Sequence, residues 1–330
     1  MTGELLRSTA YFGERQRSGD RFTADALLDL YTAAPVVASV VIRGIAGFGP
    51  RHDLRSDVTL SGSEDPPLAV TAVGPAETIR RLASETARLL PRGLVTLESV
   101  RSADAPLPAT PSVTLTAYVP RGRRVSGAPA YVAVGDVFRR HRFRAAIAYL
   151  GVDGIAGGRR RRAVFFGRNL DVPAVVVGTG PTDRAVAAVD DLRSMSAVQL
   201  LTVETATTRT PPVAPLPDPE VRRKLTVQTC ATTRYDGVPV HRALVDRLRE
   251  VHRTAGVTVL RGVWGFDGDA ATLTDSVLRV GRRVPVTTIA VDTPERIATS
   301  LAVVDALTAG RAVVTVGPVA DAVSVDRDTM

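Results

Sequence analysis

One order of elements recurs three times along the chain, and this repetition constrains the fold more than any other feature. Each copy opens with an apolar run, ELLRSTAYF, SVTLTAYV or KLTVQTCA, followed by a helical pattern such as HRALVDRLREVH. In that pattern Leu244, Leu248 and Val251 recur at helical spacing, with Arg and Glu opposite. A second apolar run, a proline-led third run, a second helix and a closing run (LVTLESV, LLTVETA or VVTVGPV) complete each copy. Each copy of about 95 residues is therefore predicted to fold as β-α-β-β-α-β.

Proline-rich segments separate the copies. RSADAPLPATP and TATTRTPPVAPLPDPE have no apolar periodicity, which is typical of linkers. We therefore predict repeat 1 at 1–101, a linker at 102–111, repeat 2 at 112–205, a Pro-rich linker at 206–221, repeat 3 at 222–319 and a tail at 320–330.

The strand patterns predict how the copies pack together. A β-α-β-β-α-β unit has both helices on one face of its sheet, so something else must cover the other face. Apolar residues at both alternating positions of VPAVVVG and VTVL indicate that both faces are buried. The sheets of the other two copies are the simplest cover. We predict an α+β protein in which three ferredoxin-like repeats form one pseudo-trimer.

A glycine-rich corner follows the second strand of every copy, and we predict a turn there. It reads RGIAGFG at 43–49, LGVDGIAGG at 150–158 and RGVWGFDG at 261–268. One interpretation is that these glycines are needed only for the backbone conformation at the end of a strand. Alternatively, backbone N–H groups freed by glycine can hold phosphate oxygens beside an adjacent Arg. Repeat 2 has lost the Arg and the Phe of this corner, where Leu150 and Ile155 stand instead.

The blocks VLRGVWGFDG, VPVTTIAVDTPERI and GLVTLESV resemble the PII-like domain of unknown function 190, a relative of the nitrogen-regulatory PII proteins. The resemblance covers all three repeats and is weakest in repeat 2. It implies trimers of ferredoxin-like domains, with adenine nucleotides bound between neighbouring subunits and a loop after the second strand acting on partner proteins.

Carried onto this sequence, the resemblance implies ligand-binding residues in repeats 1 and 3. These are Arg43, Gly44, Gly47, Phe48, Gly49, Arg92, Gly93, Arg261, Gly262, Gly265, Phe266, Gly310 and Arg311. Arg92-Gly93 and Gly310-Arg311 form a second predicted loop, just before the closing strand. Repeat 2 has SMSAVQ at this place, without glycine or arginine. Loss of charge-assisted hydrogen bonds predicts a degenerate cleft in repeat 2.

Repeat 2 instead carries a basic loop, GGRRRR, which contains Arg159, Arg160, Arg161 and Arg162. Residues 112–206 hold 14 Arg and only 7 acidic residues, so most of the net charge of +8 lies there. The loop is either a solvated basic segment or a docking site for an acidic partner or anionic lipid. A nucleic acid is the weaker candidate, because aromatics make up only 5% of the chain and the central strands lack them.

Several function classes are not favoured. A single cysteine, Cys230, and four histidines without metal-ligand spacing indicate no metal site. No nucleophile elbow, P-loop or HExxH motif is present, so we expect no enzyme activity. No apolar run approaches 18 residues, which predicts no membrane span. The opening MTGELLRS does not resemble a secretory signal, which favours a cytoplasmic protein.

The leading hypothesis is a monomeric pseudo-trimer that regulates a partner. It would hold no tightly bound cofactor, bind ATP, ADP, AMP or another small anion, and act on a protein partner such as a membrane transporter or channel. Two alternatives stay open. One is a ligand-free scaffold that docks an acidic partner through the basic loop of repeat 2, and the other is a sensor of a small molecule that is not a nucleotide.

Overall fold

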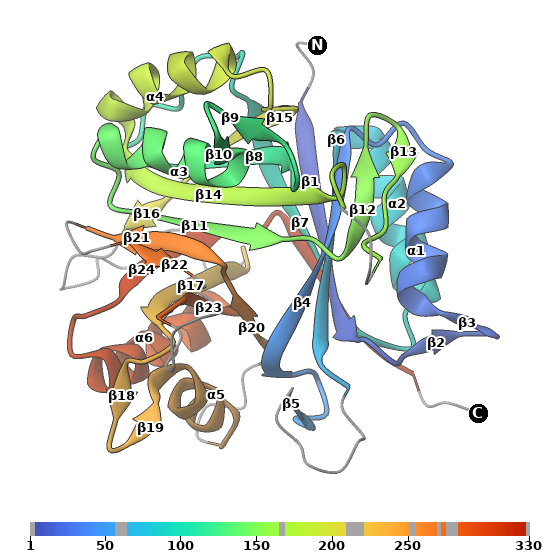
Figure 1. Cartoon of the computed structure of the whole chain (residues 1–330). Helices are drawn as coiled ribbons and strands as arrows, with labels where there is room; N and C mark the ends of the chain where they lie inside the picture. The colour runs from blue at the N-terminus through green and yellow to red at the C-terminus, as the bar shows by residue number, and fades with distance from the viewer. Residues whose placement is uncertain are drawn as a thin grey trace.

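The computed structural model describes residues 4–56, 65–164, 169–208, 221–250, 255–268, 272–274 and 283–327. Within these residues the chain is an α+β structure with six helices and one extensive antiparallel sheet (Figure 1). Repeat 1 contains β1 (Leu5–Gly13), α1 (Thr23–Thr32), β4 (Ala38–Phe48), β6 (Pro67–Pro75), α2 (Ala76–Leu89) and β7 (Arg92–Ser102). Repeat 2 contains β8 (Ser112–Pro120), α3 (Ala130–Arg140), β11 (Ala145–Leu150), β14 (Pro173–Pro181), α4 (Thr182–Ser194) and β15 (Leu200–Thr205). Repeat 3 contains β17 (Arg223–Cys230), α5 (Val240–Glu250), β20 (Val257–Arg261), β23 (Pro285–Asp292), α6 (Pro294–Thr308) and β24 (Val313–Pro318).

The four main strands lie in the same order in each repeat. In repeat 1 this order is β4-β6-β1-β7, with every pair antiparallel. Repeats 2 and 3 follow it as β11-β14-β8-β15 and β20-β23-β17-β24. The strand registers therefore define equivalent positions in the three repeats.

Both faces of the sheets are buried, as the apolar patterns predict. Each pair of helices packs its apolar stripe on the outer face of its own sheet and encloses a separate core. A fourth core lies between the inner faces and draws on all three repeats: Val40, Tyr118, Tyr149, Val175 and Leu260 are among its members. In Figure 1 the helices accordingly lie at the periphery and the strands between them. Burial of this shared apolar surface holds the repeats together.

A short hairpin precedes the first helix of each repeat, where the sequence pattern predicts only a turn. The hairpins are β2–β3 (Arg17–Ser18 and Arg21–Phe22), β9–β10 (Arg124–Val125 and Ala128–Pro129) and β18–β19 (Arg234–Tyr235 and Val238–Pro239). Ser126-Gly127 and Asp236-Gly237 adopt positive φ at their tips, at 48° and 83° and at 47° and 79°. Such dipeptides favour tight hairpin turns, so the signal was present in the sequence.

Two predicted connecting segments contain ordered structure. Ala103, in the predicted linker 102–111, is buried in the core of repeat 2. The predicted tail 320–330 contains β25 (Asp321–Asp326), which pairs with β7 of repeat 1. In the Pro-rich linker, β16 (Thr207–Thr208) pairs with β24, and residues 209–220 lie outside the described part of the chain.

Candidate functional site

The segment after each second strand extends the sheet of a neighbouring repeat. In repeat 1, β4 pairs with β6 over its first half and with β20 of repeat 3 over residues 44–48. In repeat 2, β12 (Asp153–Ala156) pairs with β4 of repeat 1. In repeat 3, β21 (Trp264–Asp267) pairs with β11 of repeat 2. Repeat 1 thus contributes a strand segment to repeat 3, repeat 3 to repeat 2 and repeat 2 to repeat 1, which closes a cycle.

Glycines in these segments lie where two backbones approach closely. A Cβ atom would lie 2.3 Å from the facing carbonyl oxygen at Gly47, 2.2 Å at Gly154 and 2.5 Å at Gly265. Only glycine fits such a contact. The predicted turn at 43–49 is wrong for repeat 1, because β4 continues unbroken to Phe48. In repeats 2 and 3 a two-residue break, at 151–152 and 262–263, separates the strands.

Most residues of the predicted corners take part in these contacts between repeats. Gly44 lies against Pro67 and Val259, and Gly262 against Ile147 and Pro285. A packing role is therefore sufficient to explain these glycines, and their role toward a ligand stays a prediction.

The aromatic residues of the two corners are both buried in a neighbouring repeat, whereas the two arginines differ in exposure. Phe48 lies in the core of repeat 3. Phe266 is buried in the core of repeat 2. Arg43 is exposed, and its Nε donates to the Glu14 carboxylate over 2.9 Å. Its equivalent Arg261 lies half-buried at the end of β20.

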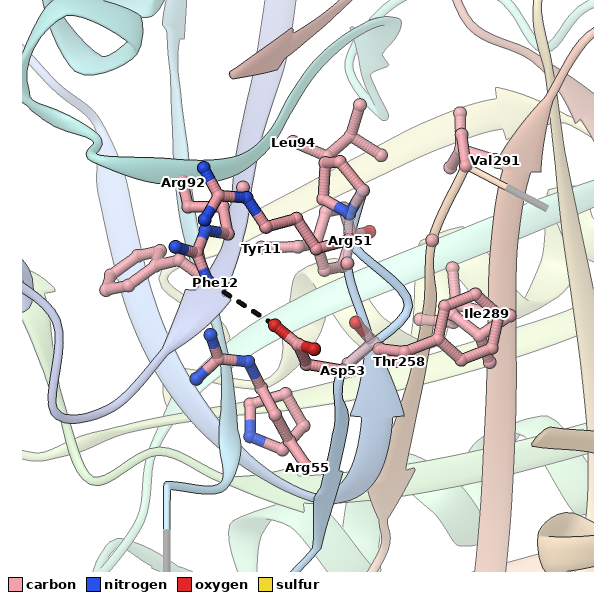
Figure 2. A pocket seen from close by; sticks show the side chains of 18 of the residues that line it. Tyr11, Phe12, Arg51, Asp53, Arg55, Arg92, Leu94, Thr258, Ile289 and Val291 are labelled. Carbon is pink, nitrogen blue, oxygen red and sulfur yellow. Dashed lines mark hydrogen bonds and ion pairs between the residues drawn. The ribbon is translucent and has the colours of Figure 1, made fainter. Parts of the chain in front are cut away.

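A cleft between repeats 1 and 3 opens where β4 ends (Figure 2). Four predicted ligand residues line it together: Phe48, Gly49, Arg92 and Gly93. Repeat 1 contributes β1, residues 48–55 and the start of β7, and repeat 3 contributes β20 and β23. Its apolar walls include Tyr11, Phe12, Leu94, Val257, Ile289 and Val291. The cleft holds about 40 Å³ of free space and is open to solvent on one side.

Three arginines converge at one side of this cleft, and sequence reasoning identified only Arg92. Arg51 and Arg55 lie in the segment GPRHDLR after the glycine corner, whose alternating charges were the available signal. Figure 2 shows Arg51, Arg55 and Arg92 on the side away from Ile289 and Val291. Arg92 Nη1 lies 3.5 Å from Asp53 Oδ2, the pair marked by the dashed line.

Burial and neighbouring positive charge both act on the arginine cluster. Burial and then the positive charge of Arg92 lower the pKa of Arg55, although Asp53 raises it. Arg55 also forms an ion pair with Asp65. An arriving anion would therefore gain from several positive charges held close together in a partly dry site.

Gly93 belongs to the cleft for a steric reason. A Cβ atom there would lie 2.3 Å from the Tyr11 carbonyl oxygen. The strand registers give the equivalent position in repeat 3. Thr96 of β7 pairs with Thr9 of β1, and Thr315 of β24 pairs with Thr226 of β17, so Thr96 and Thr315 are equivalent. Arg311 is thus the counterpart of Arg92, and Ala312 stands in place of Gly93.

The repeat 3 residues of the second predicted loop lie apart from this cleft. Gly310 has a φ of 74° just after α6, which is the conformation that ends helices. Arg311 is exposed, and its Nε donates to the Thr308 carbonyl over 3.5 Å. The cleft between repeats 1 and 3 is lined by neither of them, nor by Arg261. Residues 269–271 and 275–282 after this corner lie outside the described residues.

The basic loop of repeat 2 is largely paired within the chain. Arg160 lies in β13 (Arg159–Arg160) and forms ion pairs with Asp25, Asp153 at 2.7 Å and Asp29 at 3.1 Å. Arg160 donates hydrogen bonds to the Asp153 carboxylate, and they are the main reason that the pKa of Arg160 is raised.

Two further arginines of the loop have intramolecular partners. Arg162 lies 3.1 Å from Asp25, and Arg161 lies 4.0 Å from Asp171. The loop therefore joins repeat 2 to α1 of repeat 1, and its predicted role in partner binding stays a prediction.

A second cavity, of about 150 Å³, lies where the three inner faces meet. It contains a buried charge network that sequence reasoning missed. Arg7 donates to Glu98 over 2.7 Å and lies 2.5 Å from Glu204, and Lys224 lies 2.7 Å from Glu98. The equivalent positions hold Arg7, Thr114 and Lys224 on the first strands and Glu98, Glu204 and Gly317 on the closing strands. Thr114 stands in place of one cation and Gly317 in place of one anion, so two cations remain beside two anions and their charges balance.

The network fixes the protonation of Glu98. Burial alone would raise the pKa of this carboxyl, but Arg7 and Lys224 outweigh burial and lower it to about 2. Burial likewise raises the pKa of Tyr118 to about 12, so its hydroxyl stays neutral beside the network. Paired charges from all three repeats thus meet in the central cavity.

These features define an α+β protein of three linked repeats with an arginine-lined cleft between two of them. The chain belongs to the DUF190 family, described as Uncharacterized ACR, whose model matches residues 5–102, 112–208 and 222–320. The three matches coincide with the three sets of strands and helices.

Solved structures are similar at a much lower level. An aspartate kinase from Synechocystis is 11% identical with a TM-score of 0.30, over 96% of this chain and 45% of that one. This chain thus spans under half of that kinase's length. A protein provisionally named a chlorite dismutase is 10% identical with a TM-score of 0.19, over 61% of this chain and 93% of that one.

Within the described ranges, no helix has the length and apolar character required to cross a membrane. Nor do those ranges contain three His, Cys, Asp or Glu side chains grouped to hold a metal ion.

Proposed function

We propose that the chain is a PII-like regulatory protein, a single-chain pseudo-trimer of ferredoxin-like repeats. The common strand order and the cyclic exchange of strands between repeats support this arrangement. Because linked repeats meet at roughly millimolar effective concentration, assembly does not depend on protein concentration. The chain would then act as a monomer whose clefts have diverged from one another.

We propose that the cleft between repeats 1 and 3 binds the anionic group of a small ligand, with adenine nucleotides as the first candidates. The observation that carries this proposal is the convergence of Arg51, Arg55 and Arg92 beside Gly93 in a cleft with apolar walls. Guanidinium groups pair with phosphate oxygens in two-pronged geometry, and apolar walls suit a base or ribose. The phosphate would lie against the three arginines, and the remainder of a nucleotide would extend through the open mouth of the cleft.

Ligand occupancy would reach a partner through the segment after β4. Residues 49–55 start at the cleft and carry Arg51 and Arg55, so a bound anion would fix the base of this segment. An ordered segment presents one surface to a protein partner, whereas an unordered one must lose entropy to do so. We propose that the protein acts by binding and not by catalysis.

The small free volume of the cleft, about 40 Å³, favours a second candidate function, the sensing of a compact carboxylate or phosphate compound that is not a nucleotide. The scaffold alternative has less support, because Arg160 and Arg162 are already paired with Asp25 and Asp153.

Calorimetric titration of the purified chain with ATP, ADP, AMP and cyclic AMP tests the first candidate. Binding of one nucleotide at one site per chain is the expected result. Binding of inorganic phosphate but of no nucleotide would favour the second candidate. Absence of heat with all of these compounds at millimolar concentration would remove both.

A further inference from the structure

The chain returns to the candidate cleft after the third repeat has ended. The family matches end at residue 320, and β25 follows at Asp321–Asp326. This strand pairs antiparallel with β7 of repeat 1, in a register that places Asp326 opposite Arg92. A segment outside the repeated units therefore lies along the strand that carries a cleft arginine.

Asp326 occupies the arginines that the proposed ligand needs. Its Oδ1 lies 2.9 Å from Arg51 Nε and 3.3 Å from Arg92 Nε. One carboxylate therefore holds two of the three cleft guanidinium groups. The Arg51 Nε–H cannot serve Asp326 and a second anion at once. The ion pair between Asp326 and Arg92 likewise offsets positive charge that an arriving anion would use.

Few buried side chains anchor β25 to the rest of the protein. Only Val325 is buried, in the core of repeat 1, whereas Asp321, Val323, Ser324 and Asp326 are exposed. After the strand, Arg327 N donates to the Pro91 carbonyl over 2.9 Å and its Nη2 to the Ala87 carbonyl over 3.1 Å. An edge strand with one buried side chain can separate locally without unfolding the repeat beneath it.

From these contacts we propose that Asp326 is a built-in competitor for the anion site, and that the ligand's carboxylate or phosphate group displaces it. This inference rests on the proposed function of the cleft. The carboxylate also indicates the ligand's chemistry, since the group that replaces it must bring an anionic oxygen within reach of both Arg51 Nε and Arg92 Nε. Displacement frees the end of β25, so ligand occupancy is transmitted to the C-terminal segment.

Asp326→Asn tests the proposal, because it removes the charge and keeps the size of the side chain. The probes are ATP and inorganic phosphate, titrated into the full chain by calorimetry. Two half-exposed ion pairs predict that this variant binds the probe about 3- to 30-fold more tightly than the unmodified chain. Asp321→Asn, at the other end of the same strand, is the matched control and should leave the affinity unchanged.

Hydrogen exchange supplies a second readout. A saturating probe should speed exchange of the amides of β25 in the unmodified chain, because their strand end is released. Tighter or equal binding by the unmodified chain compared with Asp326→Asn, or probe-induced protection of β25, overturns the competitor while leaving the ligand site intact. Failure of both the unmodified chain and Asp326→Asn to bind either probe overturns the site and the competitor together.

Discussion

Substitution of Glu98 by glutamine tests whether charges shared between repeats hold the assembly together. Glu98 is 3% exposed and bridges Arg7 of its own repeat to Lys224 of repeat 3. Its pKa is about 2 in the folded chain against an ordinary 4.5, so folding stabilises the ionised form by about 3 kcal/mol. Glu98→Gln removes this charge and leaves Lys224 without that partner. We expect the free energy of unfolding at pH 7 to fall by about 3 kcal/mol.

The pH dependence distinguishes this account from a simple packing defect. Because folding lowers the pKa of Glu98, its contribution is complete above about pH 4.5 and is lost as the pH falls toward 2. The difference between Glu98→Gln and the unmodified chain should therefore shrink over that interval. Urea unfolding at pH 7, 5 and 3, followed by circular dichroism and by the fluorescence of Trp264, measures it.

Glu204→Gln is the matched control. Glu204 pairs with Arg7, and its side chain is 18% exposed, so the expected loss is smaller, about 1 kcal/mol. Equal stability of Glu98→Gln and the unmodified chain at pH 7 would refute the reasoning. A loss of the same size at pH 3 and pH 7 would refute it as well.

Three further predictions address other parts of the molecule. Gly47→Ala should lower the free energy of unfolding by about 2 kcal/mol or more, because the new Cβ meets the Val257 carbonyl oxygen at 2.3 Å. Gly49→Ala has open space around the new Cβ and should change stability little. Thermal unfolding compares the two variants, and equal losses would contradict the strand contact at Gly47. His241 should stay neutral down to about pH 4 in an NMR titration, because burial and then the charges of Arg242 and Arg261 lower its pKa. The folded state therefore disfavours the charged imidazole, and the free energy of unfolding should fall as the pH drops from about 6.5 to 4. A titration midpoint near pH 6.5 would contradict this environment. Arg160→Ala should destabilise the chain by about 1–3 kcal/mol in urea and Arg159→Ala by under about 0.5 kcal/mol, since Arg160 joins Asp153 to α1; a neutral Arg160→Ala would mean that the ion pairs contribute nothing.

Local patterns predicted the elements within each repeat, because apolar periodicity and proline-led starts act over a few residues. They also predicted burial of both sheet faces, since β14 and β20 are apolar at both alternating positions. The exchange of strands between repeats did not follow, because a pattern does not name its pairing partner. Gly47 and Gly265 accordingly suggested a turn, although their role is contact with a strand more than 100 residues away.

The candidate site was predicted only in part for a similar reason. Arg92 and Gly93 were identified, but Arg51 and Arg55 join them only after β4 crosses to repeat 3. Asp326 was missed because nothing in a six-residue segment indicates that it returns to repeat 1. Alignment of equivalent strand positions could have revealed the balance of Arg7 and Lys224 against Glu98 and Glu204.

Titration of three forms of the chain with ATP tests the cleft between repeats 1 and 3 most directly. These are the unmodified chain, Arg92→Ala and Arg311→Ala, in which the same substitution is made at equivalent positions of repeats 1 and 3. Loss of a charge-assisted hydrogen bond predicts that Arg92→Ala binds about 10- to 150-fold more weakly, while Arg311→Ala binds like the unmodified chain. Equal affinities of Arg92→Ala and the unmodified chain, or weaker binding by Arg311→Ala alone, would contradict the assignment of the ligand to this cleft.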